Sequence, residues 1–391
     1  MEHANAGFDP SVSAKDQDAG PLHASPSSSV LDLPQLYNKP SAQPLLYAMA
    51  LLAVAPSSWA LEDRKAKPGP ISEEGVPSYL TRIISSPLAW IPSDIAKEEI
   101  WEAASKRLAE RSGRTAMPSV SRTFKIPIDG HDCSNTIDIK LHEPSLTGDN
   151  LGHKTWVASY LLAKRLPTLL PRLFPSITPS STNHNPTQSS PNTPQSHHPP
   201  TPSHPHILEL GAGTGLVGLA ASALFQTTTH LTDLPSILPN LTHNIAQNAP
   251  LTATSTVTAG PLDWSDPPSY LPPTTTNTNH PESNSKSKSK YNLILAADSL
   301  YAPEHPSCIV DVMKALLFKD EQRSARVLVE LPFRSAGEPE PAHEELRKRM
   351  REAGFVLLLE GEEVGFDDWE EMRGEGGQLE VRCWWGVWGR G

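Results

Sequence analysis

The chain has 391 residues, of which 37% are hydrophobic and 40 are proline. Because many of the prolines cluster in polar tracts that cannot form a core, the folded part must be much shorter than the chain. The net charge of −11 argues against an extended surface that follows nucleic-acid phosphates, so we expect no direct binding to nucleic acid.

The three cysteines, Cys133, Cys308 and Cys383, stand far apart and form no C-x-x-C pair. Neither a disulfide framework nor a structural zinc site is expected, which indicates a reducing compartment. The chain begins acidic and polar, unlike a secretory leader, and its most apolar run, Leu45–Ala55, is too short to span a bilayer. We therefore expect a soluble cytoplasmic monomer without membrane contact or bound metal.

The N-terminal part begins without a clear pattern. Residues 1–30 are rich in Ser, Ala and Asp and lack periodicity, which predicts disorder. Residues 31–60 contain several leucines and the apolar run, which predict a short helix in a small cluster against the main body. Further on, Pro92-Ser93-Asp94 predicts the start of a helix and Gly113 its end, because apolar residues recur every four positions between them.

Two runs of alternating apolar and polar residues follow, at 124–126 and 137–141. The turn signal Asp129-Gly130 lies between them, so they predict a β-hairpin. We group residues 31–145 as one N-terminal region of helices and a hairpin.

Two polar tracts interrupt the rest of the chain. Nine prolines and no charged residue fall within 175–205, and the second tract, 272–290, ends in Ser-Lys repeats. We expect both to be disordered surface inserts within one domain, 146–391, because they separate elements of the same series. The spacing of the histidines near the first tract fits no fixed metal geometry; they are His184, His197, His198, His204 and His206.

Residues 206–391 otherwise alternate between strand and helix signals. The predicted strands are Ile207–Leu210, His230–Thr232, Ser255–Thr258, Asn292–Ala296, Val327–Leu331, Phe355–Leu359 and Leu379–Trp385. The predicted helices are Gly215–Phe225, Ile237–Asn248, Ser307–Phe318 and His343–Ala353. This alternation predicts an α/β fold with a doubly wound, mainly parallel sheet of seven strands, whose last two strands form an antiparallel edge.

A glycine turn follows the first of these strands and opens a helix. Gly211, Gly213 and Gly215 are spaced G-x-G-x-G, and Glu209 precedes them by two residues. Glycines let backbone N–H groups approach a ligand at the positive end of a helix. A dinucleotide site of the form G-x-G-x-x-G would need glycine at position 216, where Leu216 stands, and a nearby carboxylate suits a cationic ligand better than a pyrophosphate. The alternative is a tight packing turn.

The next two strands end in polar or aromatic residues. Asp233, 22 residues after Gly211, is placed to accept hydrogen bonds from both hydroxyls of a ribose. Its alternative role is to cap the turn that contains Pro235. Asp263 and Trp264 could hold an adenine, by a polar contact to its amino group and by the indole face; alternatively, Trp264 belongs to the core.

The fourth strand delivers Asp298 and Tyr301 in the sequence Asp298-Ser299-Leu300-Tyr301. The N-P-P-[YFW] tetrapeptide of enzymes that methylate adenine or glutamine amino groups is missing here. A carboxylate can orient a lysine head, and an aromatic face can flank its cation and stem. The alternative is that Asp298 caps a helix. Upstream, Trp156 precedes a helical run and either lines a ligand or acts as a buried anchor.

Residues 146–391 resemble the family 16 protein lysine methyltransferases, which implies a class I, Rossmann-like fold and S-adenosylmethionine as cofactor. The motifs that carry the resemblance are GAGTG at 211–215, LTDLP at 231–235, DW at 263–264 and DSLY at 298–301. Three further pieces resemble the fungal enzymes that methylate a lysine of translation elongation factor 2: Leu33-Pro34-Gln35-Leu36, the helix with Arg111-Ser112-Gly113-Arg114, and the G-x-K-T-W element at 152–156.

The resemblance implies which residues bind and act. The cofactor-binding residues would be Trp156, Glu209, Gly211, Ala212, Gly213, Gly215, Asp233, Asp263, Trp264 and Ala297, and the catalytic residues Asp298 and Tyr301. The expected partner is a protein substrate, elongation factor 2. Two other functions stay open: methylation of another protein, a nucleic acid or a small molecule, and a binding module that has kept the fold without activity.

Overall fold

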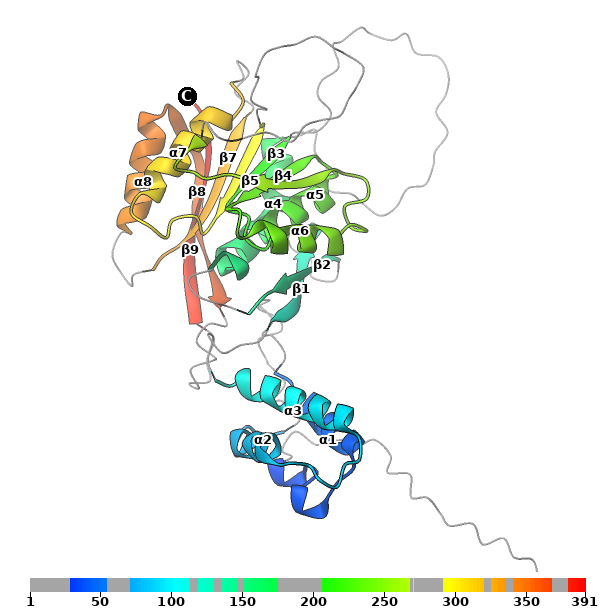
Figure 1. Cartoon of the computed structure of the whole chain (residues 1–391). Helices are drawn as coiled ribbons and strands as arrows, with labels where there is room; N and C mark the ends of the chain where they lie inside the picture. Colours follow the sequence, from blue (N-terminus) through cyan, green and yellow to red (C-terminus); the bar gives the residue numbers. More distant parts are fainter. Residues whose placement is uncertain are drawn as a thin grey trace, which may run out of the picture. The chain divides into compact units, whose positions relative to one another are not determined.

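The structure is a computed structural model. It describes residues 29–54, 71–112, 119–129, 135–145, 151–174, 206–267, 270, 291–319, 325–334, 340–367 and 379–391. The chain divides into two units, 1–54 with 67–107 and 55–66 with 108–391, and each is described by itself (Figure 1). The predictions of disorder for 1–30 and for both inserts lie outside the described residues, except for residues 29 and 30.

The first unit is helical. It contains α1 (Ala42–Leu51), α2 (Val76–Ser85) and α3 (Asp94–Ala109). The helix predicted within 31–60 is α1, and it belongs to this unit. The helix predicted after Pro92 is α3. Helix α2 was not predicted, although its buried residues recur every three or four positions: Val76, Tyr79, Leu80 and Ile83.

The Leu33-Pro34-Gln35-Leu36 segment forms a turn in this unit. The Gln35 side-chain amide donates hydrogen bonds to the carbonyl oxygens of Val30 (3.0 Å) and Leu33 (2.9 Å). The Tyr79 hydroxyl on α2 donates to the carbonyl oxygen of Pro34 at 2.9 Å. These bonds give the carbonyl oxygens of Leu33 and Pro34 hydrogen-bond donors and tie the segment to α2, so the segment has a structural role in the first unit.

The second unit is built on a seven-stranded sheet. Its strands are β3 (Ile207–Leu210), β4 (Thr229–Asp233), β5 (Val257–Pro261), β6 (Leu293–Ala297), β7 (Arg326–Pro332), β8 (Phe355–Asp367) and β9 (Leu379–Arg390). Their order is β5-β4-β3-β6-β7-β9-β8, and β9 is antiparallel to both of its neighbours. The predicted doubly wound sheet with an antiparallel edge is confirmed.

The predicted strand ends were wrong by two residues or more in three strands. Strand β5 starts two residues later than predicted, and β8 and β9 extend well beyond Leu359 and Trp385. The extension of β8 is rich in exposed acidic residues, which an edge strand with one solvent-facing side accommodates. A strand end predicted from apolar residues alone is therefore placed too early in the sequence.

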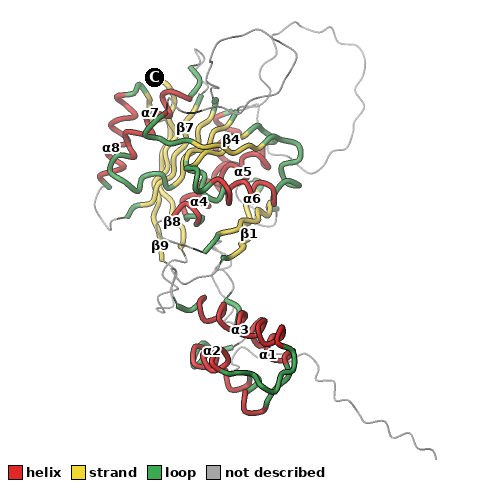
Figure 2. Tube along the Cα trace, in the orientation of Figure 1, coloured by secondary structure: helices red, strands yellow, loops and turns green. Residues whose placement is uncertain are grey.

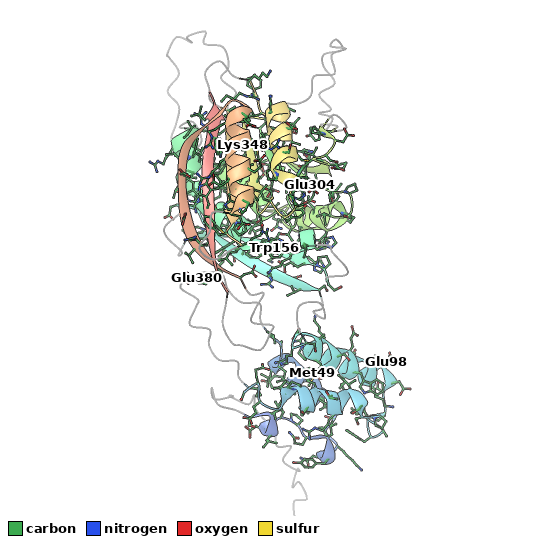
Figure 3. All side chains as sticks on the ribbon, turned by 90° about the vertical axis from the view of Figure 1, so that its left-hand side faces the viewer. Met49, Glu98, Trp156, Glu304, Lys348 and Glu380 are labelled. Carbon is green, nitrogen blue, oxygen red and sulfur yellow. The ribbon has the colours of Figure 1, made fainter. Side chains whose placement is uncertain are left out.

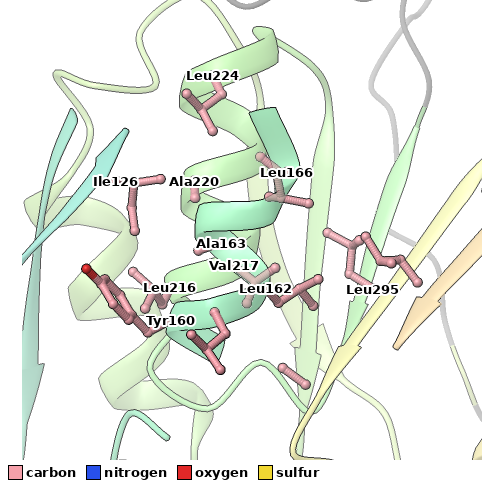
Figure 4. Close-up of a cluster of buried hydrophobic side chains, with 14 of the residues drawn as sticks. Ile126, Tyr160, Leu162, Ala163, Leu166, Leu216, Val217, Ala220, Leu224 and Leu295 are labelled. Atoms are coloured by element: carbon pink, nitrogen blue, oxygen red, sulfur yellow. The ribbon is translucent and has the colours of Figure 1, made fainter. Parts of the chain in front are cut away.

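Helices cover both faces of the sheet (Figures 1 and 2). Helices α4 (Val157–Leu173), α5 (Leu216–Phe225) and α6 (Leu238–Gln247) lie on one face, and α7 (His305–Leu316) and α8 (Pro341–Glu352) lie side by side on the other (Figure 3). The first core joins Leu162 and Leu166 of α4 to Val217 of α5 and Leu295 of β6 (Figure 4). Among the helices that the structure describes, none combines the length and apolar character needed to cross a membrane.

The predicted hairpin is β1 (Val120–Pro127) and β2 (Thr136–Glu143). It belongs to the second unit, because its buried side chains, including Ile126, join the core of α4 and α5. The predicted N-terminal region 31–145 is therefore divided between the two units, since a two-stranded hairpin needs another apolar surface to be stable.

Asparagine side chains of α6 pair with the open edge of β2. Asn244 accepts a hydrogen bond from the His142 N–H (2.8 Å) and donates to the His142 oxygen (3.2 Å). Asn248 pairs with both backbone groups of Lys140 in the same way, at 3.0 and 2.7 Å. Four helical residues rise about 6 Å and two strand residues about 6.6 Å, so the two repeats match. Asn244 also donates to the Thr214 oxygen in the glycine turn (3.0 Å).

We expect Asn244→Ala to lower the free energy of unfolding by about 3 kcal/mol. The change leaves the part-buried His142 N–H and the buried Thr214 oxygen without their partner, and each such loss costs about 1–3 kcal/mol. Denaturant unfolding of the full chain measures it. Asn240→Ala is the matched control, because Asn240 makes one bond to an oxygen that Asn244 also serves. Equal small losses in both variants would contradict the role of this pairing.

Candidate active site

The glycine turn joins β3 to α5. Gly211, Gly213 and Gly215 all have positive φ, at 67°, 55° and 92°, a conformation that side chains with a Cβ adopt at a cost. A Cβ at Gly211 would lie 3.0 Å from the Trp264 indole, and one at Gly213 would lie 3.1 Å from the Gly152 carbonyl oxygen. The turn therefore lies between the Trp264 side chain and the segment at Gly152.

The carboxylate of Asp233 holds the turn from the end of β4. Its Oδ2 accepts a hydrogen bond from the Gly213 N–H and its Oδ1 one from the Leu234 N–H, both at 2.7 Å. The Ala212 N–H donates to the Thr232 carbonyl oxygen at 3.0 Å, which adds a second link to β4. Burial raises the pKa of Asp233 against the lowering effect of these bonds. The expected proximity of Asp233 to the turn is present, and Asp233 also caps the turn that follows it.

Glu209 of β3 binds the first turn of α5, the helix that follows the glycine turn. Its Oε2 accepts a hydrogen bond from the Gly218 N–H of α5 at 2.9 Å, and a Cβ at Gly218 would come within 2.5 Å of that oxygen. Burial raises the pKa of Glu209 to about 8. Its contact is with the helix, so its predicted part in cofactor binding would be to hold the start of α5. No role was predicted for Gly218, whose missing Cβ leaves room for this carboxylate.

Trp264 lies against the turn, as its distance from Gly211 shows, and is half-buried. The centres of the Trp264 and His305 rings are 5.3 Å apart, with the rings nearly perpendicular. Trp264 also packs against the core that contains the buried side chains of α7. Asp263 is exposed, and its Oδ1 accepts from the backbone N–H and hydroxyl of Ser265 at 2.8 and 2.7 Å, which lowers the pKa of Asp263. Trp264 therefore packs on the core, as the alternative had it, and its contact with an adenine stays a prediction, whereas the bonds of Asp263 are local.

The Gly152–Trp156 segment makes polar contacts to β8, to the glycine turn and to β2. Lys154 is buried and pairs with Asp367 at the end of β8 (2.5 Å), and its ammonium lies 4.7 Å from the centre of the Trp156 ring. The Thr155 hydroxyl bonds to the Thr214 hydroxyl (2.7 Å), and its N–H donates to Glu143 of β2 (2.9 Å). Trp156 is half-buried directly before α4. The sequence predicted this element but not its partners.

Asp298 follows β6 and has a left-handed backbone, with φ of 50°. Its N–H donates to the Glu330 oxygen of β7 at 2.9 Å, and its Oδ1 accepts from Arg334 at 2.5 Å. Burial raises the pKa of Asp298 to about 6, although Arg334 and Lys154 lower it. The alternative that Asp298 caps a helix is wrong, because α7 begins only at His305. Nothing in the sequence indicated Arg334.

Tyr301 stands beside Asp298 at the surface. It is 59% exposed, and its ring is perpendicular to the His305 ring, with the two ring centres 4.1 Å apart. Its pKa is raised, first by burial of its hydroxyl and then by the negative charges of Asp233 and Asp298. The hydroxyl is therefore within electrostatic reach of both carboxylates. Ala297, the last residue of β6, is buried beneath this group.

These residues lie together at the carboxyl ends of the parallel strands. The order β4-β3-β6-β7 reverses between β3 and β6, and the helices that follow these two strands lie on opposite faces. In open α/β sheets, ligands bind at this switch point, outside the carboxyl ends of the strands. The glycine turn and Asp233 form one half of the group, and Asp298 with Tyr301 form the other.

Comparison with known proteins identifies the family. The profile of the lysine methyltransferase family matches residues 135–340. The chain belongs to this family. As the sequence implied, its cofactor is S-adenosylmethionine, and the positive-φ turn with Asp233 and Trp264 beside it fits such a ligand.

Two curated relatives are similar over most of the chain. Protein-lysine N-methyltransferase EFM2 of Saccharomyces cerevisiae is 30% identical over 71% of this chain and 58% of its own length, so the chain spans little more than half of that relative. Protein-lysine N-methyltransferase rrg1 of Schizosaccharomyces pombe is 27% identical over 91% of this chain and 97% of its own length. The solved structure of M. jannaschii TYW2 in complex with AdoMet is 13% identical over 48% of this chain and 69% of its own, with a TM-score of 0.31, and adds nothing to the assignment.

We expect Asp233→Ala and Gly213→Arg each to abolish binding of S-adenosylmethionine, measured by calorimetric titration. The first removes the carboxylate at the turn, and the second places a side chain at a positive φ against the Gly152 oxygen. Gly354→Arg is the matched control, because Gly354 also has a positive φ but open space around its Cβ position. Unchanged affinity in both site variants would remove this pocket as the cofactor site.

Proposed function

We propose that the protein is an S-adenosylmethionine-dependent protein-lysine N-methyltransferase that acts on a lysine of translation elongation factor 2. The observation that carries the proposal is that Asp298 and Tyr301 lie at the end of β6, next to the glycine turn and Asp233. The sequence resemblance to the fungal enzymes supports the substrate, as does the similarity to EFM2. Such a substrate would place the enzyme in the cytoplasm.

The cofactor half of the site would be held by the glycine turn, Asp233, Trp264 and Trp156. Asp233 would accept hydrogen bonds from the ribose hydroxyls, and the Trp264 ring would lie against the adenine. When bound, S-adenosylmethionine supplies the methyl group on its sulfonium. The turn would orient that group toward the end of β6, since an aligned near-attack geometry contributes up to roughly 7–11 kcal/mol to the rate.

The substrate half of the site must receive a lysine amine. The Tyr301 ring would flank the lysine stem and Asp298 would accept a hydrogen bond from the amine. Free lysine has a pKa of about 10.4, so the amine must lose a proton to become a nucleophile. Burial favours that loss whereas a carboxylate opposes it, so Asp298 would orient the amine rather than abstract its proton.

We expect Asp298→Ala to lower the turnover number at least about 100-fold while leaving the affinity for S-adenosylmethionine within about twofold of the wild type, because Asp298 belongs to the substrate half. Methyl transfer and calorimetric titration measure the two effects. Asp311→Ala on the exposed side of α7 is the matched control. Near-normal turnover of the Asp298 variant would show that the substrate side lies elsewhere.

We expect the purified enzyme to transfer labelled methyl groups to purified elongation factor 2, with the product lysine located by mass spectrometry. The Asp298→Ala variant serves as the inactive control. Replacing the labelled lysine of the substrate by arginine should remove the signal. Label on a different cytosolic protein, with elongation factor 2 unlabelled, would retain the lysine methyltransferase and reject this substrate.

A further inference from the structure

Arg334 lies two residues beyond β7 and reaches the carboxylate that the proposed function places beside the substrate amine. One of its guanidinium nitrogens is 2.5 Å from Asp298 Oδ1. The Asp298 side chain is 6% exposed and that of Arg334 is 45% exposed, so the pair has one buried and one accessible member. Strand β7 also fixes the backbone of Asp298 through the Glu330 oxygen. The same strand therefore holds Asp298 in its left-handed conformation and carries its counterion.

Four charged groups meet around this point. Besides Asp298 and Arg334, they are Lys154 before α4 and Asp367 at the end of β8, which form their own buried ion pair at 2.5 Å. Two cations thus balance two carboxylates. The other titratable groups that sense Asp298 are the Tyr301 hydroxyl and the Cys383 thiol on β9, whose pKa values are both raised and which are therefore uncharged.

We propose that Arg334 is a positioning residue that neutralises Asp298, so that the substrate lysine meets a charge-balanced site and can be held as a neutral amine. This inference rests on the proposed lysine methylation. An unpaired carboxylate next to the amine would stabilise the ammonium form, which has no lone pair for attack. With its charge compensated, Asp298 still offers an acceptor: among the residues that the structure describes, none donates a hydrogen bond to Oδ2.

The two oxygens of Asp298 then have different tasks. Oδ1 is held by Arg334, which fixes the plane of the carboxylate, and Oδ2 accepts a hydrogen bond from the amine. Removal of the guanidinium charge raises the pKa of Asp298, because the ionised carboxylate loses a stabilising cation, and raises the pKa of an amine beside it, because the ammonium form loses a repelling cation. Both changes reduce the fraction of enzyme with an ionised carboxylate and a neutral amine at neutral pH.

The first test needs no substrate. Carboxyl carbon signals of the full-length protein are followed by NMR from pH 4 to 9, and Asp298→Asn assigns the Asp298 signal. Arg334→Met should raise the titration midpoint of Asp298 by about one pH unit or more, whereas Arg334→Lys should retain most of the wild-type midpoint. Arg349→Met is the matched control, because Arg349 is similarly exposed, at 41%, and pairs with Glu345 on α8. An unchanged midpoint in Arg334→Met overturns the inference.

The second test is kinetic and uses the protein that the wild-type enzyme methylates, in its unmethylated form. Arg334→Met should lower kcat at least about tenfold at pH 7 without raising KM, and should move the acidic limb of the kcat profile to higher pH. Arg334→Lys should recover most of kcat. A raised KM with unchanged kcat and an unchanged profile would make Arg334 a docking contact and overturn the inference. A shifted midpoint together with a wild-type enzyme that methylates no lysine would reject the proposed function and keep the pairing.

Discussion

The hydrogen bond from the Gly213 N–H to Asp233 is the constraint on which the site depends. It joins the turn after β3 to the end of the neighbouring strand, and Gly213, which donates it, has a positive φ that glycine adopts without strain. From this fixed point the other contacts follow. Trp264 lies on Gly211, the Gly152 segment lies on Gly213, and Asn244 bonds to the carbonyl of Thr214. Residues from β4, α6, the loop after β5 and the segment before α4 therefore contact the turn.

A second constraint is electrostatic. Buried carboxyl groups whose pKa values are raised lie near the carboxyl ends of the strands, notably Glu209 and Asp298. Each has its own compensation: a helix N–H for Glu209, and a guanidinium for Asp298. Because buried polar and charged groups are costly without hydrogen-bond or ion-pair partners, these contacts stabilise the folded domain, and they also fix where the acidic side chains point.

The sequence predicted the parts of the fold and site that depend on local pattern. Apolar runs and glycine spacing located the strands, the turn and the places where Asp233, Trp264, Asp298 and Tyr301 leave the sheet, and the structure brings Asp233 to the turn as expected. The roles of these residues toward ligands stay predictions. The family resemblance was confirmed by the profile match.

What the sequence could not predict are pairs formed over long distances in the chain. Lys154 and Asp367 are 213 residues apart, and Arg334 is 36 residues from Asp298, with no local pattern to connect them. Asn244 and Asn248 looked like ordinary polar residues of a helix, and only the position of β2 gives them a partner. The hairpin was assigned to the N-terminal region because neighbours in sequence were taken as neighbours in space.

The place of β9 in the sheet has a consequence for synthesis of the chain. β9 lies between β7 and β8, although β8 precedes it in the sequence. On the ribosome, β7 and β8 emerge first, and each then presents an unpaired edge of N–H and carbonyl groups. β7 can pair with β6 on one side, but its other edge and the edge of β8 have no native partner until β9 has been made. During that interval the two edges can pair with each other or with another chain, so the nascent domain is exposed to misfolding and aggregation just before its sheet is completed.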